Sequence, residues 1–180
     1  TTGDGMVAIG YQALMTEDTQ GYSTAVGSGA LALQNAGASA FNVAVGHEAG
    51  TAVSTGVQNT LVGTYAGHDL NTGSFNVAMG LNALSLGTSL GSTVAIGYTA
   101  GKTLATASNN TIIGSQAGEI RTGAGNTIVG QYAGRDGTDG VDNTFIGRNS
   151  GYTITSGSKN SILGMYNGNQ DGLDIRDDDN

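Results

Sequence analysis

The sequence contains no cysteine, no proline and no tryptophan, and only 11% of its 180 residues are charged. Without cysteine the fold can hold neither disulfides nor thiolate metal sites. No run of 18 apolar residues occurs, so we expect no membrane insertion of this segment. Only six Lys and Arg stand against a net charge of −8, which argues against a nucleic-acid partner.

Glycine and β-forming residues are what the chain has in excess. Its 32 glycines follow no three-residue period and proline is absent, so a collagen helix is excluded. Disordered chains are typically highly charged and poor in β-branched residues, whereas this one is rich in Val, Ile and Thr. The composition therefore predicts a folded β-protein.

The stretches "NTIIGSQAG", "NTIVGQYAG" and "NTFIGRNSG" belong to an internal repeat. We call the Gly that follows the apolar pair the marker Gly and count positions from it. Successive markers lie 16 to 19 residues apart, most often 17; they are Gly10, Gly27, Gly46, Gly63, Gly80, Gly97, Gly114, Gly130, Gly147 and Gly164. Ten regular units indicate a repeat architecture.

Each unit has a characteristic residue at several positions. Position −1 is always apolar and position +3 is Ala in eight units. Position −4 is Asn in seven units, at Asn42, Asn59, Asn76, Asn110, Asn126, Asn143 and Asn160. Stacked in register, these side chains would form a ladder of amide hydrogen bonds, as in cross-β stacks.

A unit of 17 residues is too short for a helix pair and suits one coil of a β-solenoid. We therefore predict an all-β parallel β-solenoid, or β-roll, over residues 1–168, with an acidic exit segment or linker at 169–180. The four residues before the marker Gly are predicted to form the main strand. A second strand is expected to point one apolar residue per coil inward: Leu33, Val53, Leu70, Leu86, Leu104, Ile120 and Ile154.

The main strand is apolar on both faces, as "NTIVG" illustrates, and such a strand is buried on both sides. One face must point into the thin coil, and the other needs a partner, for which a second copy of the chain is the natural candidate. We expect position −1, as in Val129 and Ile146, to point inward. The small residues at −2 would then let sister chains approach; these are Ala8, Ala25, Ala44, Ala78 and Ala95. Two-fold and three-fold association both satisfy this expectation.

The stretches "MVAIGYQAL", "STAVGSGAL", "NVAVGHEAG" and "TVAIGYTAG" resemble the head repeats of YadA-like trimeric autotransporter adhesins, and "NTIVGxxAG" looks more like repeats of bacteriophage tail fibres. The resemblance covers residues 5–168. The adhesin repeat is typically near 14 residues, shorter than the unit here. The resemblance implies a side-by-side homotrimer, an extended rod and a role in surface attachment.

No catalytic constellation and no cofactor motif is apparent, so we expect a protein that is not an enzyme and has no cofactor. Asp171, Asp174, Asp177, Asp178 and Asp179 fit no calcium loop and are interpreted as a solvated end, and the Asp-containing turn at 135–143 is interpreted as a polar corner. Tyr65, Tyr132 and Tyr98 are candidate contacts for a glycan, with packing between chains as the alternative.

The leading interpretation is a structural and attachment rod, a segment of a trimeric phage tail fibre or similar virion appendage that contacts a host-surface glycan or protein receptor. The protein would then reside in a virion tail or on a cell surface. The alternatives are the head of a bacterial trimeric adhesin, a self-assembling extracellular filament and an ice-binding solenoid. The last would use the Thr column at −3, which Val7, Val43, Val77 and Val94 interrupt.

Overall fold

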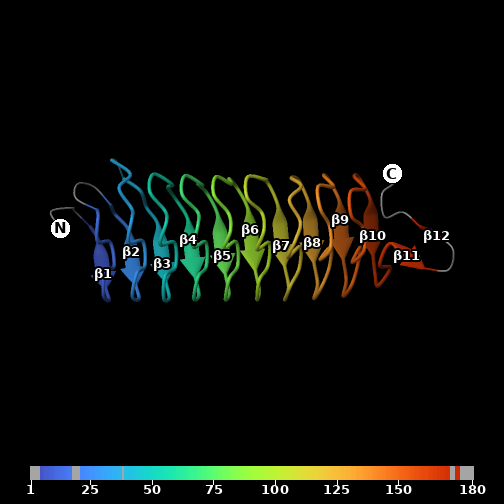
Figure 1. The fold of residues 1–180 in the computed structure, drawn as a ribbon, viewed down its shortest axis with the longest axis horizontal. Coiled ribbons are helices and arrows are strands. Elements are labelled where there is room, and N and C mark those ends of the chain that lie inside the picture. Colours follow the sequence, from blue (N-terminus) through green and yellow to red (C-terminus); the bar gives the residue numbers. More distant parts are fainter. Residues whose placement is uncertain (1–4, 18–20, 38, 171–172, 175–180) are drawn as a thin grey trace.

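A computed structural model describes residues 5–17, 21–37, 39–170 and 173–174. Ten three-residue parallel strands lie side by side along a rod, with the two ends of the chain at opposite ends (Figure 1). They are β1 (Val7–Ile9), β2 (Thr24–Val26), β3 (Val43–Val45), β4 (Thr60–Val62), β5 (Val77–Met79), β6 (Val94–Ile96), β7 (Thr111–Ile113), β8 (Thr127–Val129), β9 (Thr144–Ile146) and β10 (Ser161–Leu163). A short antiparallel pair, β11 (Asn169–Gln170) and β12 (Leu173–Asp174), follows.

The predicted all-β parallel solenoid is confirmed. Each strand pairs only with the strands of the preceding and following repeats, and equivalent positions are aligned, as with Thr127 and Thr144 or Ile128 and Phe145. We number the coils 1 to 10 after the strands that begin them. A spacing of about 4.8 Å between hydrogen-bonded strands gives the nine steps from β1 to β10 a length of roughly 43 Å.

The return half of each coil is a stack of turns; within the described residues the predicted second strand is not formed. Positions +2 and +4 have left-handed backbone conformations, as at Tyr65 (φ 57°) and Gly67 (φ 57°). The turns still stack by hydrogen bonds between coils: the Gly50 N–H donates to the Ala66 carbonyl at 2.9 Å, and the Gly67 N–H to the Ala83 carbonyl at 2.9 Å. The backbone is therefore paired along both sides of the rod.

The marker glycines form a column in which no side chain fits. A Cβ atom on Gly63 would lie 2.7 Å from the carbonyl oxygen of Gly80 in the next coil. The φ of Gly63 is also +130°, which residues with a side chain rarely adopt. Close contact between backbones is thus the reason for the most regular feature of the sequence.

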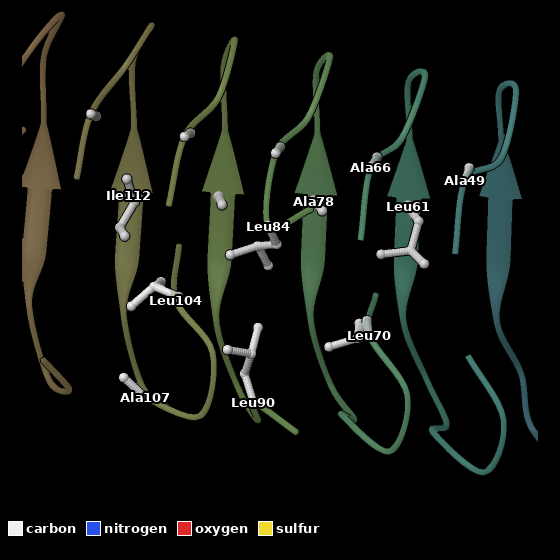
Figure 2. Packing of buried hydrophobic residues seen from close by; sticks show 14 of the residues in the cluster. Ala49, Leu61, Ala66, Leu70, Ala78, Leu84, Leu90, Leu104, Ala107 and Ile112 are labelled. Atoms are coloured by element: carbon white, nitrogen blue, oxygen red, sulfur yellow. The ribbon is translucent and has the colours of Figure 1, made fainter. Parts of the chain in front are cut away.

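The core is one column of side chains inside the rod, part of which Figure 2 shows. Strand position −2 points into it, so Ala25, Ala44, Ala78 and Ala95 are fully buried. The expectation that these alanines face a sister chain is wrong, and so is the inward orientation expected of Val129 and Ile146, which are partly exposed. Ala8, in the terminal coil, is exposed.

Packing between positions −2 and +4 explains this orientation. Where −2 is large, +4 is Gly, as in Leu61 with Gly67 and Phe145 with Gly151; where −2 is Ala, +4 can be Leu, as in Ala78 with Leu84. The narrow interior admits one large side chain per coil at this level. Coils that have Ala and Gly at the two positions are filled from neighbouring coils, and a Cβ on Gly101 would meet Leu84 and Ile112 side chains at 3.1 and 3.2 Å.

The inward residues expected on the return segment are confirmed for Val53, Leu70, Leu104 and Ile154, which are fully buried. They are wrong for Leu33, Leu86 and Ile120, which are 47%, 45% and 46% exposed. The first group stands at position +7 and the second at position +6. One residue of offset turns a side chain to the other side of the wall, so only the +7 residues reach the core.

Candidate functional site

The outward face of the ten-stranded sheet is the most extensive exposed apolar surface of the described residues. Positions −3 and −1 point away from the core on every strand, which gives the pattern partly exposed, buried, partly exposed from β2 to β10. Position −1 forms an unbroken apolar column: Ile9, Val26, Val45, Val62, Met79, Ile96, Ile113, Val129, Ile146 and Leu163. The surface that needs a partner is therefore this column and its surroundings, which we call the sheet face.

Two further columns border the sheet face. Position −5 precedes the buried Asn, and position +1 follows the marker Gly. Their large members are exposed, including Phe75 at 58%, Leu81 at 43% and Tyr98 at 50%. Tyr22 and Phe41 stack along the −5 column with ring centroids 5.6 Å apart.

Charge is nearly absent from the sheet face. Positions −5, −3, −1 and +1 of coils 1 to 6 contain no Asp, Glu, Lys or Arg, although the chain carries a net charge of −8. In coils 7 to 10 the same columns hold Asp142, Arg148 and Lys159. Position −3 changes as well, from mostly Val in the first six coils to Thr111, Thr127, Thr144 and Ser161. The face is thus widest and most apolar toward the N-terminal end.

Beneath the sheet face, the seven predicted ladder asparagines stand in one buried column. The carboxamide oxygen of Asn126 accepts from the Asn143 backbone N–H at 3.0 Å and from its Nδ2 at 3.1 Å. The Nδ2 of Asn143 also donates to the Gly157 carbonyl at 3.0 Å. The same pattern joins Asn42 to Asn59 and Asn59 to Asn76. Each buried amide is therefore satisfied by the next coil.

Sequence reasoning missed two hydroxyl residues in this column. Thr93 stands at −4 in coil 6, where its N–H donates to Asn76 Oδ1 at 3.0 Å and its Oγ1 accepts from the Asn110 N–H at 3.4 Å. Ser23 fills the same position in coil 2 and accepts from the Asn42 N–H at 3.0 Å. Both could have been found from their repeat position alone, because a hydroxyl can both donate and accept.

The interior of the first coils is polar at the return side too. Glu17 and Gln34 stand at +7, the position of Leu70 and Leu104 further along, and both are buried. Gln34 Nε2 donates to Glu17 Oε2 at 2.8 Å, and Gln34 Oε1 accepts from Asn42 Nδ2 at 2.8 Å. This network links the Asn column to the opposite wall of the coil.

Arg121 is the one fully buried basic residue of the described chain, also at position +7. Its guanidinium fills the space left by Gly137, lies 5.3 Å from the Phe145 ring centroid, and donates to the carbonyls of Gly140 at 3.0 Å and Ile154 at 3.2 Å. Burial lowers the pKa of Arg121 to about 10, an effect that the nearby Asp139 carboxylate opposes. The residue ties three successive coils together.

The three candidate glycan contacts lie in different coils and form no common site. Tyr65 makes edge contacts with the rings of His47 and His68, both at 5.5 Å. Tyr132 contacts Tyr152 at 6.4 Å, and Arg135 lies over both rings. Tyr98 stands alone on the +1 column. A glycan contact by these residues stays a prediction.

Charged side chains meet mainly on the return side of the rod. His68 lies between two carboxylates, with Nδ1 2.6 Å from Asp69 Oδ1 and Nε2 3.2 Å from Glu48 Oε2. In the described part of the chain, no group of three or more His, Asp or Glu is arranged to hold a metal ion, and no pocket opens. The same residues include no helix that could cross a membrane. Asp171 and Asp177–Asp179 of the acidic end lie outside the described residues.

Comparisons with known proteins leave the family open: no protein-family model, no curated protein and no solved structure matches the chain.

Proposed function

We propose that this chain is a structural and attachment rod whose sheet face packs against copies of the same chain. The observation that carries the proposal is the exposed apolar column at position −1, which runs along all ten strands. Extended exposed apolar surfaces are unusual on soluble monomers and typically mark protein interfaces. A rod of stacked coils transmits reach and stiffness and needs no reactive groups, so the proposed role is not enzymatic.

The size of the sheet face supports a stable assembly. Nine steps of about 4.8 Å and the roughly 20 Å between positions −5 and +1 give a face of about 860 Å². Stable protein complexes bury about 800 Å² per partner. Covering the face with another chain would also remove from water the exposed Phe75, Met79 and Leu81 of coil 5.

A homotrimer is the proposed state, on the strength of the repeat resemblance, and the proposed owner is a phage tail fibre or similar virion appendage. Its location would be a virion tail or another extracellular surface, where buried ladders such as Asn126–Asn143 help resist unfolding. Host contact would come from return-side corners, including the Tyr65 and Tyr132 clusters, with a glycan or protein receptor as partner. The bacterial adhesin head is the alternative owner of the same architecture; a downstream coiled-coil stalk and membrane anchor in the full-length protein would favour it, and a self-cleaving chaperone or tip domain would favour the fibre.

One observation keeps the ice-binding alternative open. Thr111, Thr127 and Thr144 face outward on a flat sheet, one per coil, as an ice-binding array requires. The neighbouring −1 column is apolar throughout, which suits a protein partner better. A thermal-hysteresis assay separates the two, because only an ice binder would depress the freezing point below the melting point.

Native mass measurement tests the proposal. The expected result is a multiple of the 17.9-kDa chain, with three chains for the homotrimer. A 17.9-kDa species alone, persisting at high micromolar concentration, would contradict self-association through the sheet face. A self-assembling filament would instead give a broad series of larger species.

A further inference from the structure

The two columns that border the sheet face differ in side-chain size and charge from coil to coil. They are separated by six residues of nearly extended chain, roughly 20 Å, so within one chain they cannot touch. Each coil contributes one residue to each column. From coil 1 to coil 10 the pairs are Gly5 and Tyr11, Tyr22 and Ser28, Phe41 and His47, Gln58 and Thr64, Phe75 and Leu81, Ser92 and Tyr98, Asn109 and Ser115, Gly125 and Gln131, Asp142 and Arg148, Lys159 and Met165.

The two members of a pair complement one another. A small residue stands opposite a large one in Gly5–Tyr11, Tyr22–Ser28 and Ser92–Tyr98. Apolar stands opposite apolar in Phe75–Leu81, and polar opposite polar in Gln58–Thr64 and Asn109–Ser115. The charged pair, Asp142 with Arg148, has opposite signs. Because members of a pair are out of reach of each other in one chain, the match implies contact between chains.

Rotation about an axis parallel to the rod brings such pairs together. All copies then point the same way and keep the same height, and their strands run in the same sense around the axis. The −5 column of one copy therefore meets the +1 column of the next copy at the same coil. This holds for two-fold and three-fold rings alike, and it fails for antiparallel packing, where coil 2 would face coil 9.

We propose that copies of this chain associate parallel and in axial register, with Asp142 of one chain paired to Arg148 of the next. The inference rests on the proposed self-association and adds its geometry. Both side chains are exposed, and within the described residues neither makes an ion pair in its own chain. They are free to serve a neighbour.

A shift of one coil would remove this match. Sliding the +1 column forward by one coil places Asp142 opposite Met165 and Gly125 opposite Arg148. Sliding it the other way places Lys159 opposite Arg148, two like charges. In a repeat array every coil resembles the next, so the apolar −1 column alone sets no register. The charged pair supplies the distinction, as charged flanking positions do in coiled coils.

Disulfide trapping tests the geometry, and the absence of native cysteine makes it clean. In the double variant Asp142→Cys/Arg148→Cys, oxidation should join neighbouring chains into a covalent ring, visible as a trimer on a non-reducing gel. Each single variant should give no covalent species. The control Asp142→Cys/Ser115→Cys offsets the cysteines by two coils, about 9.6 Å in height, which is beyond disulfide reach, and it should stay uncrosslinked.

Charge exchange gives a second readout. Asp142→Arg and Arg148→Asp alone should each raise the concentration of half-dissociation roughly three- to tenfold, and the double exchange should restore the wild-type value. Lys102→Asp, on the return side, changes the net charge as Arg148→Asp does and should leave assembly unchanged.

The outcomes separate the two proposals. A wild-type multimer that gives no 142–148 crosslink, or in which the double exchange dissociates as much as both single changes combined, overturns the register inference and leaves self-association intact. A wild-type monomer overturns both.

Discussion

The ring of Phe145 occupies the space that a side chain at Gly151 would need. A Cβ atom on Gly151 would lie 2.8 Å from three of the ring carbons, and Gly151 also has a φ of +59°. The two residues face each other across the coil, one on the strand and one on the return turn. Their sizes are linked, and the same link runs through Leu61 with Gly67.

Gly151→Ala should therefore destabilise the fold. Left-handed strain and overpacking together predict a loss of about 2–4 kcal/mol in the free energy of unfolding. Gly91→Ala is the matched control, because its nearest neighbours lie 3.6 and 3.8 Å away and its φ is not left-handed. Thermal unfolding followed by circular dichroism measures both. Equal effects of the two changes would contradict the linked sizes.

The Asn column predicts a graded response at Asn126. Asn126→Leu should cost about 3 kcal/mol or more, because the Asn143 N–H and Nδ2 lose their acceptor in a buried site. Asn126→Thr should cost less, since Thr93 already fills this position in coil 6. Asn35→Ala, at an exposed site, provides the control. Denaturant unfolding checks the order, and a threonine variant no better than leucine would count against the ladder.

Neighbouring residues of one strand should respond in opposite ways. Ile128→Asp puts a charge into the core and should abolish folding, with a cost of about 4 kcal/mol or more. Val129→Asp and Ile146→Asp should keep the circular dichroism spectrum of a folded chain but lower the native mass, since both side chains face outward. Gln131→Asp should change neither. Loss of fold in Val129→Asp with a folded Ile128→Asp would reverse the assigned faces.

Arg121 should be replaceable by an apolar residue of similar length. Arg121→Met keeps the space beside Gly137 filled and removes a buried charge, so stability should be unchanged or higher. Arg121→Ala opens a cavity and should cost about 2–4 kcal/mol.

The pH dependence of Arg121 has a definite sign. The folded pKa of about 10 lies below the ordinary 12.5, so between these values the unfolded chain binds more protons. The contribution of Arg121 to stability therefore rises as pH increases through that window. Comparing wild type with Arg121→Met at pH 9 and pH 11 isolates it; a difference that shrinks as the pH falls toward 9, with wild type ahead, would contradict this sign.

The period and the fold could be predicted because backbone contacts dictate them. A column such as Gly63–Gly80 admits no side chain, and a buried amide such as Asn126 must repeat to be satisfied, so both leave a strict spacing in the sequence. The direction of the strand faces could not be read from "NTIVG", which is apolar on both sides. The signal that was present is the link between positions −2 and +4, Ala with Leu or a large residue with Gly.

The return segment failed for a related reason. A lone apolar residue at +6 or +7 looks the same in sequence, yet Leu86 is exposed and Leu104 is buried. Only the alignment of all ten units distinguishes them. Arg121 could not have been foreseen, because a buried guanidinium needs the vacancy at Gly137 and the carbonyls of two later coils, and no local pattern announces these.

Thiol labelling of a single cysteine on the sheet face tests most directly whether copies of the chain cover that face. In the isolated chain the Val45 side chain is 38% exposed, and Asn35 is exposed on a loop. We predict that the cysteine of Val45→Cys reacts at least tenfold more slowly than that of Asn35→Cys under native conditions, and equally fast in denaturant. Equal native rates at high micromolar concentration would contradict a covered sheet face.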